Sequence, residues 1–247
     1  MLLGGYLASF NWKIPFLGYL LAFLIVPSGL IALSNRLPAT NVARKGTDND
    51  TLPAVPFWPS AYVFVSAFLA SGLFFITPVQ LPFYLKNAFN ASPFEMGAAI
   101  ALGNTVGAGI SLFYHRFRRH LNYVGIYAFI FLAMAAGYWL VASAESYTPA
   151  LLGMVIGGLG FGLYIPNHSS WILSIVSAKR RGFGVGLVTT AMFLGQFSAP
   201  ILVQPFIDPA DPSAVWTSMS RLLIILGLLY VALARFGDKP ASGPPAA

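Results

Sequence analysis

The sequence predicts an all-α integral membrane protein with seven transmembrane helices. The composition, the length of the apolar segments and the placement of the basic residues all support this prediction. Of the 247 residues, 57% are hydrophobic and only 9% carry a charge, whereas soluble domains average about 25% charged residues. The mean hydropathy is +0.73. So few charges cannot cover a water-facing surface, which argues against a soluble enzyme, a nucleic-acid-binding protein and a disordered protein.

Seven apolar segments are long enough to cross a bilayer, which takes about 20 residues of helix. They are residues 14–34, 58–85, 94–114, 121–143, 149–176, 183–206 and 214–234. The last one contains Arg221, whose long side chain can reach the polar interface from near a helix end. The chain has no cysteine, so disulfides and thiolate metal sites are excluded.

The basic residues alternate with the predicted spans. Three Lys and Arg residues (Lys13, Lys86 and Arg221) fall on one side of the membrane, and the other side carries Arg36, Arg44, Lys45, Arg116, Arg118, Arg119, Lys179, Arg180, Arg181, Arg235 and Lys239. Basic loops face the cytoplasm, so we expect the N-terminus outside and the C-terminus inside a plasma or inner membrane. The clusters are interpreted as topology anchors, with the bilayer as partner and no role in nucleic-acid binding.

Polar segments divide the chain into domains. Residues 35–57 form a Pro-containing polar linker, interpreted as a cytoplasmic connector. The linker separates residues 1–34, the end of one helix and one full span, from a six-helix domain at residues 58–236. Residues 237–247 are predicted to be a disordered tail.

The six-helix domain contains a weak internal repeat. Gly72 precedes Pro78 by six residues in one span, and Gly160 precedes Pro166 by six residues three spans later. The predicted topology runs these two spans in opposite directions. The six spans are therefore predicted to form two three-helix repeats of inverted topology, residues 58–143 and 149–235, with Pro78 matching Pro166. Inverted repeats with interrupted helices are typical of secondary transporters.

A second match supports this repeat. Gly103-Asn104 lies one span after the Gly72–Pro78 motif, and the similar pair Gly195-Gln196 lies one span after the Gly160–Pro166 motif. Small residues also recur four apart on single helix faces, which lets helices approach closely in a bilayer. The residues assigned to packing or hinge roles are Gly72, Pro78, Gly103, Asn104, Gly107, Gly158, Gly160, Gly162, Pro166, Gly195 and Pro200.

Several segments resemble the major facilitator superfamily, a family of secondary transporters. LPFYLKNAFNASPFEMGAAIALGNTVGAGIS is similar to its seventh and eighth helices, and GGLGFGLYIPNHSSW with RGFGVGLVTTAMFLGQFSAPI is similar to its tenth and eleventh. YHRFRRHLN resembles the basic loop between helices eight and nine, and GGYLASFNWKIPFLGYL the passage from helix five into helix six. The resemblance implies twelve helices in two halves, with the substrate between the halves.

The resemblance also implies that this chain begins at the end of helix five. We expect a late start of the reading frame, a degenerate copy, or a partner that supplies the other half.

Few residues within the spans can ionise. His168, beside Asn167 and just past Pro166, is the only titratable group well inside a span, and an intramembrane ionisable group is a functional candidate. It could contact a proton or a substrate, or it could bond to carbonyls that Pro166 leaves free. The amides of Gln80 and Gln196 could line a wet cavity or bond helix to helix, and for Asn104 helix bonding is favoured.

Family position, carried over to this sequence, implies a set of residues near a solute pathway. These are Phe75, Gln80, Tyr84, Tyr164, Asn167, His168, Met192 and Gln196. Their aromatic content suits an amphipathic small molecule. The predicted function is secondary active transport of such a solute by alternating access, with efflux as the candidate direction and import left open by the sequence. Every acidic residue is confined to loops, span ends or the tail, so we expect proton or ion coupling to reside mainly outside this chain, with His168 in a secondary role.

Three alternatives to a transporter follow from the sequence. A seven-helix receptor is disfavoured because no span has a central Lys for a retinal Schiff base and no Cys can form an extracellular disulfide. A membrane hydrolase lacks a G-x-S-x-G or H-E-x-x-H motif, so no catalytic residue, metal or cofactor is assigned. A non-functional or partner-dependent membrane fragment remains open.

The topology leads to a first prediction. Residues 35–57, 115–120 and 178–182 should be cytoplasmic, and residues 86–93, 144–148 and 207–213 outside. Single cysteines can be introduced and labelled with an impermeant reagent, because the chain has no cysteine of its own. A cysteine at position 47 should stay unlabelled from outside, and labelling there would invert the assignment.

Overall fold

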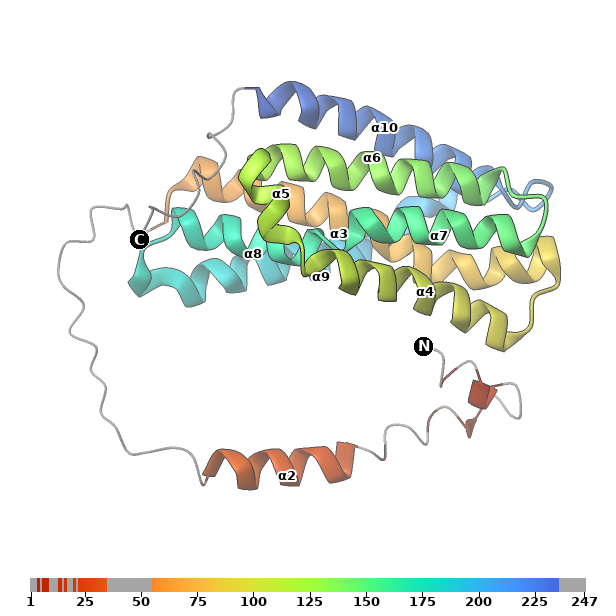
Figure 1. Ribbon diagram of the computed structural model, residues 1–247, viewed down its shortest axis with the longest axis horizontal. Coiled ribbons are helices and arrows are strands. Elements are labelled where there is room, and N and C mark those ends of the chain that lie inside the picture. Colours follow the sequence, from red (N-terminus) through yellow and green to blue (C-terminus); the bar gives the residue numbers. More distant parts are fainter. Residues whose placement is uncertain are drawn as a thin grey trace.

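The computed structural model describes residues 4, 6–8, 13, 14, 16, 20, 22–34 and 55–235. Within these ranges every regular element is helical (Figure 1). The elements are α2 (Ala22–Ser34), α3 (Phe57–Phe89), α4 (Pro93–Ser111), α5 (Tyr114–His120), α6 (Tyr123–Ala142), α7 (Tyr147–Phe161), α8 (Tyr164–Ile175), η2 (Ala178–Arg180), α9 (Arg181–Val203), η3 (Gln204–Phe206) and α10 (Ala214–Ala234). Residues 35–54 of the predicted linker and the predicted tail lie outside the described residues.

Five spans in the described part of the chain are long and apolar enough to cross a membrane, and a sixth is added if α4 and α5 count as one bent span. They match the last six of the seven predicted spans. The first predicted span, residues 14–34, falls partly outside the described residues. Its described helix, α2, has 13 residues and is about 20 Å long, which is short of the hydrocarbon core of about 30 Å.

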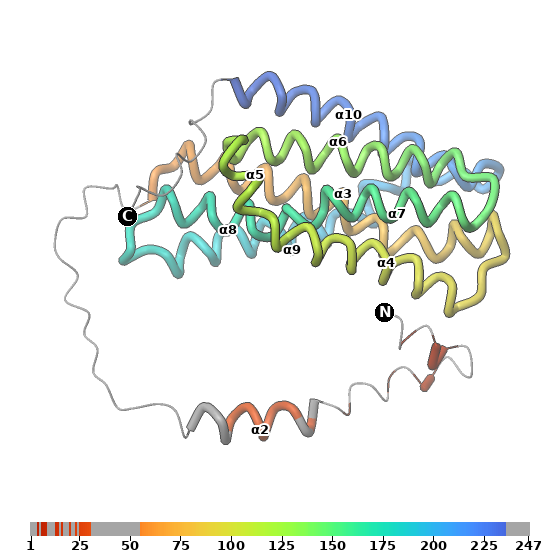
Figure 2. Tube along the Cα trace, in the orientation of Figure 1, coloured from red at the N-terminus to blue at the C-terminus, as the bar shows by residue number. Residues whose placement is uncertain are grey.

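Successive spans run in alternating directions along a bundle (Figure 1). As a result α5, the turn between α8 and α9, and the C-terminal end of α10 lie at the same end (Figures 1 and 2). Most basic residues of the described spans gather there: Arg116, Arg118, Arg119, Lys179, Arg180, Arg181 and Arg235. We call this the basic end of the bundle.

Regular helix is interrupted at Gly162 and Leu163, between α7 and α8, although the fifth predicted span runs on as one apolar stretch of 29 residues, Tyr147–Ile175. Glycines are frequent on its approach, and each one favours helix less than alanine by about 1 kcal/mol. Pro166 then lies in the first turn of α8, where its missing N–H leaves no helical hydrogen bond unmade. The irregular turn lies just before Pro166, and its part in an internal repeat stays a prediction.

In the second predicted span the expected interruption is absent. α3 is one helix of 33 residues that includes both Pro78 and Pro82. Hydrocarbon offers a freed backbone carbonyl no alternative partner, which favours continuing the helix. The two halves of the proposed repeat therefore differ, with a continuous helix in one and a broken helix in the other.

The predicted loop YHRFRRHLN is largely helical. α5 follows α4 after a turn at Leu112 and Phe113, and its axis is bent by 59° from that of α4. Arg118 of α5 lies over the Tyr123 ring of α6, with its guanidinium carbon 3.8 Å from the ring centre. A cation over an aromatic face is attractive, so this contact fixes α5 against the start of α6.

Helix α6 forms the centre of the bundle and lies between α10 and α7 (Figure 1). Its Tyr127 and Phe131 side chains are fully buried. Two hydrogen bonds join it to α10: Ser220 Oγ donates to Ala135 O over 2.9 Å, and Asn122 Nδ2 donates to Ala234 O over 2.7 Å. Polar bonds of this kind hold helices together where lipid gives no hydrophobic drive.

Glycines bring the backbones of neighbouring helices into contact. A Cβ atom on Gly137 of α6 would lie 2.6 Å from Gly153 O of α7, and one on Gly158 of α7 would lie 2.5 Å from Gly103 O of α4. A Cβ on Gly195 of α9 would collide with Phe68 O of α3. At Gly103, Gly158 and Gly195 the neighbouring backbone leaves no room for a side chain, and their role in packing stays a prediction.

Two of these crossings correspond to each other in the proposed repeat. Gly195 meets Gly72 where α9 crosses α3, and Gly103 meets Gly158 where α4 crosses α7. By these contacts, Gly72 of the first repeat corresponds to Gly158 of the second. The spacing to the prolines instead makes Gly72 correspond to Gly160, two residues further along. The helix pairs correspond, but the contact register differs from that of the sequence motif by two residues.

The glycine contacts lead to a stability prediction. Gly195→Ala should lower the free energy of unfolding by about 1–3 kcal/mol, the usual cost of overpacking, because the new Cβ meets backbone atoms of α3. Gly186→Ala on the same helix is the matched control, since nothing lies within 4 Å of its Cβ position.

The control variant should be as stable as the unmodified protein or more stable, because alanine favours helix by about 1 kcal/mol over glycine. Denaturation in detergent, followed by circular dichroism, measures both effects. Equal stabilities for the two variants would contradict the close packing of α9 on α3.

Candidate functional site

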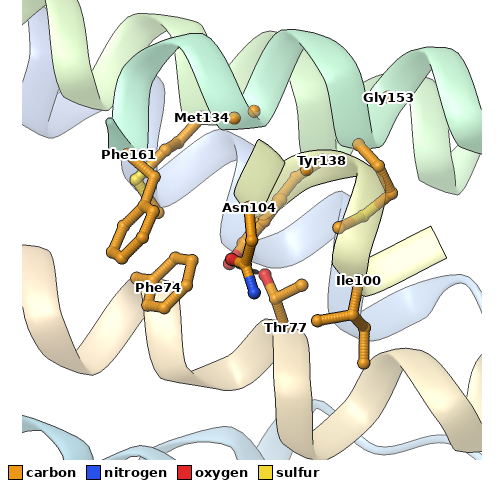
Figure 3. Close-up of a pocket in the computed structure, with 12 residues that line it drawn as sticks. Phe74, Thr77, Ile100, Asn104, Met134, Tyr138, Gly153 and Phe161 are labelled. Carbon is orange, nitrogen blue, oxygen red and sulfur yellow. Dashed lines mark hydrogen bonds between the residues drawn. The ribbon is translucent and has the colours of Figure 1, made fainter. Parts of the chain in front are cut away.

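A small cavity lies between α3, α4, α6 and α7 (Figure 3). Its volume is about 30 Å³, which admits water but no larger solute. Apolar side chains and glycines make up most of the wall, which consists of Phe74, Thr77, Ile100, Gly103, Asn104, Met134, Tyr138, Gly153, Met154, Gly157, Gly158 and Phe161. A larger solute could enter only if these four helices moved apart.

The polar groups of the cavity come from three helices. Thr77 Oγ1 of α3 lies 2.8 Å from the hydroxyl of Tyr138 on α6, and this hydroxyl donates to Leu73 O over 2.6 Å. Asn104 of α4 points its amide toward Thr77 (Figure 3). The Asn104 side chain is exposed and bonds to no described residue. Its amide is therefore free to bind a solute, and the helix bonding favoured from sequence is not formed with the described residues.

Two aromatic rings close one side of the cavity. Phe74 of α3 stacks on Phe161, the last residue of α7, with ring centroids 3.3 Å apart and planes inclined by 9°. Phe161 immediately precedes the break at Gly162. The stack therefore connects α3 to the point where the fifth span can bend most easily, next to the cavity (Figure 3).

His168 lies apart from this cavity, on α8. Its side chain is only 4% exposed, and its ring centroid is 4.7 Å from that of Tyr164. The Nδ1 atom is buried and has no hydrogen-bond partner among the described residues. His168 also lines a cavity of about 20 Å³ with Thr189 of α9, which is large enough for one water molecule.

Three of the predicted pathway residues use their polar atoms within the bundle. Asn167 is fully buried, accepts from the Tyr114 hydroxyl over 3.2 Å and donates to Tyr123 O over 3.0 Å. Tyr84 donates to Val141 O over 2.8 Å, and Tyr164 donates to Ala67 O over 3.4 Å. These bonds join α8 to α5 and α6, and α3 to α6 and α8, so the three side chains hold helices together.

The other predicted pathway residues are half-buried. Phe75 and Gln80 lie on α3, and Met192 and Gln196 on α9. Gln80 lines a second, larger cavity at one end of the bundle. Gln196 follows Gly195, so it lies about 100° around α9 from the face that contacts α3. A role in a pathway stays a prediction for all four.

Sequence reasoning did not select Phe74, Thr77, Tyr138 or Phe161. Thr77 directly precedes Pro78 in the sequence, and this proximity to a predicted hinge residue was the one feature that could have selected Thr77. Tyr138 lies among apolar residues of α6, and the sequence does not reveal which of the Tyr residues reaches another helix. The Phe74–Phe161 stack joins residues 87 positions apart and depends on how α3 packs on α7.

The carboxylates of the described part of the chain lie at helix ends or in connecting segments. Glu95, Glu145, Asp208 and Asp211 are its carboxylates, and each lies in a first helical turn or a connecting segment. Among the described residues no group of three His, Cys, Asp or Glu side chains could hold a metal ion. The cavity between α3, α4, α6 and α7 therefore offers hydrogen bonds and apolar contacts but no charge.

The family comparison covers most of the chain. The family model of the Major Facilitator Superfamily matches residues 1–200 and, in a second overlapping alignment, residues 63–247. Both matches contain most of α3, all of α4 to α8 and most or all of α9. This agrees with the bundle of apolar helices and with the resemblance found in the sequence motifs.

Individual relatives are distant. The chain is 27% identical over 153 residues to the uncharacterized transporter YebQ of Escherichia coli, a match that covers 60% of this chain and 33% of YebQ. It is 24% identical over 148 residues to the quinolone resistance protein NorA of Staphylococcus aureus, covering 58% of this chain and 38% of NorA. The match to the MFS-type transporter ppz2 of Metarhizium majus is 23% over 180 residues, covering 72% of this chain and 26% of ppz2.

Each of these matches spans well under half of the relative's length, so the family is established by the family model and not by one relative. The apolar helices and the family match agree that this is a multi-pass membrane protein. The chain belongs to the Major Facilitator Superfamily.

Proposed function

We propose that the chain forms one wall of the solute pathway of a secondary active transporter that exports an amphipathic small molecule. One observation carries the proposal: the free amide of Asn104 lies at a largely apolar cavity between the spans of a chain of this family. The similarity to NorA, whose name states quinolone resistance, supports export. The topology prediction, with the basic end of the bundle in the cytoplasm, belongs to the same proposal.

The chemistry of the cavity supports an amphipathic solute. Its walls offer stacked phenyl rings, methionine and small aliphatic groups, with the Asn104 amide and the Thr77 hydroxyl as polar contacts. Apolar walls with a few placed polar groups are typical of small-molecule sites. A multiply charged solute would find no counter-charge there, because none of the lining residues is charged.

Alternating access requires helices that can bend or rock without losing their backbone hydrogen bonds. The break between α7 and α8 supplies such a position next to the cavity, and the Phe74–Phe161 stack links it to α3. In this mechanism, bending at Gly162 would move Phe161 away from Phe74 and enlarge the cavity. The glycine crossing at Gly103 and Gly158 would serve as the fixed contact about which α4 and α7 rock.

The role of Asn104 can be tested by substitution. In cells that express the protein from its own gene, Asn104→Leu should raise the KM for efflux of a neutral amphipathic dye such as Nile red severalfold, because the amide no longer bonds the solute. Thr105→Val is the matched control: Thr105 is also exposed, but its hydroxyl bonds Ala101 O of its own helix over 2.8 Å.

Fluorescence efflux assays in cells, together with dye binding to the purified chain, measure these effects. We expect unchanged kinetics for the Thr105 variant. If neither efflux nor binding exceeds that of a strain lacking the gene, the proposed function is wrong. If both variants behave alike, the solute does not contact Asn104.

A second prediction concerns coupling. His168→Gln should change the apparent affinity for solute and leave the pH dependence of transport intact. The reason is that no described carboxylate contacts His168, so no acid–base pair for proton transfer is formed there. Initial efflux rates from about pH 5 to pH 8, the range over which histidine changes charge, measure both quantities. Loss of the pH dependence with unchanged affinity would instead make His168 the coupling residue.

A further inference from the structure

An apolar cavity lies between α3, α9 and α10, and none of the predicted pathway residues lines it. Its volume is about 200 Å³, and every residue of its wall is apolar or glycine. A buried water molecule needs several polar partners, and an apolar cavity of this size stays dry and takes up apolar molecules. The chemistry of the wall therefore favours a hydrocarbon group as its occupant.

The cavity follows from the way α10 packs. α10 lies mainly against α6, and it reaches α3 nearer the basic end, where the Tyr230 hydroxyl lies 2.7 Å from Ser66 Oγ. Beyond this bond α10 faces α3 and α9 only with the side chains of Met219, Leu222 and Leu226. These side chains do not fill the space between the three helices, so a cavity remains that runs along α10.

The cavity is accessible from the side that faces lipid. Leu202 of α9 is 57% exposed and Leu222 of α10 is 40% exposed, and both line it. From Met219 to Leu226 the cavity follows α10 for about 10 Å, which is comparable to the hydrocarbon of one leaflet, about 15 Å or half of the bilayer core. An acyl chain that lies parallel to α10 therefore fits its length.

An unpaired cation lies beside this cavity. Arg221 is exposed, follows the start of α10 by two helical turns, and bonds to no described residue. It precedes Leu222 and lies about 100° around the helix from it, on the side of α10 that faces lipid. Helical side chains lean toward the N-terminus of their helix, so the guanidinium extends toward the membrane surface opposite the basic end.

We propose that this cavity binds one phospholipid from the leaflet opposite the basic end. One acyl chain fills the space between α3, α9 and α10, and the phosphate accepts hydrogen bonds from the Arg221 guanidinium, whose planar fork matches phosphate oxygens. A free phosphate would leave the apolar cavity empty, and a fatty chain without a headgroup would leave the cation unpaired. The lipid site is separate from the solute pathway and does not depend on the proposed function.

Lipid binding can be measured without transport. Native mass spectrometry of the purified chain in a neutral detergent resolves individual bound lipids and gives their affinities. Dioleoylphosphatidylglycerol should occupy one tight site. Dioleoylglycerol has the same chains and no phosphate, so it should bind at least about fivefold more weakly, as expected for the loss of one contact between a cation and a headgroup.

Substitution of Arg221 tests the headgroup contact. Arg221→Gln should weaken phosphatidylglycerol binding at least about fivefold, and Arg221→Lys, which keeps the charge, should weaken it less. Lys86→Gln is the matched control, because Lys86 is an exposed cation toward the same end of the bundle that does not line the cavity. Its affinity for the lipid should stay that of the unmodified protein.

A second pair of variants tests the position of the acyl chain. Leu222→Trp should place an indole ring in the opening of the cavity and weaken phosphatidylglycerol binding severalfold. Leu228→Trp puts the same ring on an exposed position of α10 that does not line the cavity. This control should bind the lipid as the unmodified protein does.

The proposal is wrong if dioleoylphosphatidylglycerol and dioleoylglycerol bind equally well, and this comparison needs no variant that could fail to fold. Unchanged lipid binding in Arg221→Gln would contradict the phosphate contact, and unchanged binding in Leu222→Trp would contradict the place of the chain. An equal loss of affinity in Lys86→Gln and Arg221→Gln would also overturn the site, because the lipid would then respond to the total charge of this end.

Discussion

Close contact between helix backbones at glycines is the constraint on which the bundle depends. In a bilayer, lipid tails are as apolar as leucine, so burial alone cannot hold helices together. Removing the side chain at Gly103, Gly137 and Gly195 allows the backbones of α4 and α7, α6 and α7, and α9 and α3 to touch. These crossings set the spacing of the helices, and the spacing in turn leaves the small cavity beside Gly103 and Gly158.

Polar bonds between helices complete this packing. Tyr138 of α6 donates a hydrogen bond to α3, Asn167 joins α8 to α5 and α6, and Ser220 joins α10 to α6. Most of these partners are backbone carbonyls, which remain available at any position along a helix. A tyrosine or serine can therefore bond two helices without a matching polar side chain, and much of the polar content of the spans serves the fold.

The two cavities differ in chemistry because they lie at different depths. Between the spans, near Asn104, the described walls are apolar and uncharged, as the cost of burying charge in hydrocarbon requires. At the end of the bundle, near Asp208 and Trp216, the chain can place carboxylates beside aromatic rings. The cavity between the spans therefore offers apolar contacts and hydrogen bonds, whereas the cavity at the end of the bundle also has carboxylates in its lining.

Composition and the length of apolar segments by themselves determined the helical membrane fold, six of the spans and the end at which basic residues gather, because hydrocarbon forces each span to satisfy its own backbone. Family motifs identified the superfamily. Only the tertiary structure decided that α3 continues through Pro78 while regular helix is interrupted at Gly162 in the fifth span, that the segment after Ser111 forms helix α5, and that the polar atoms of Tyr84 and Asn167 bond to other helices. Local propensity cannot settle these points, because each depends on which backbone carbonyl or ring a distant helix presents.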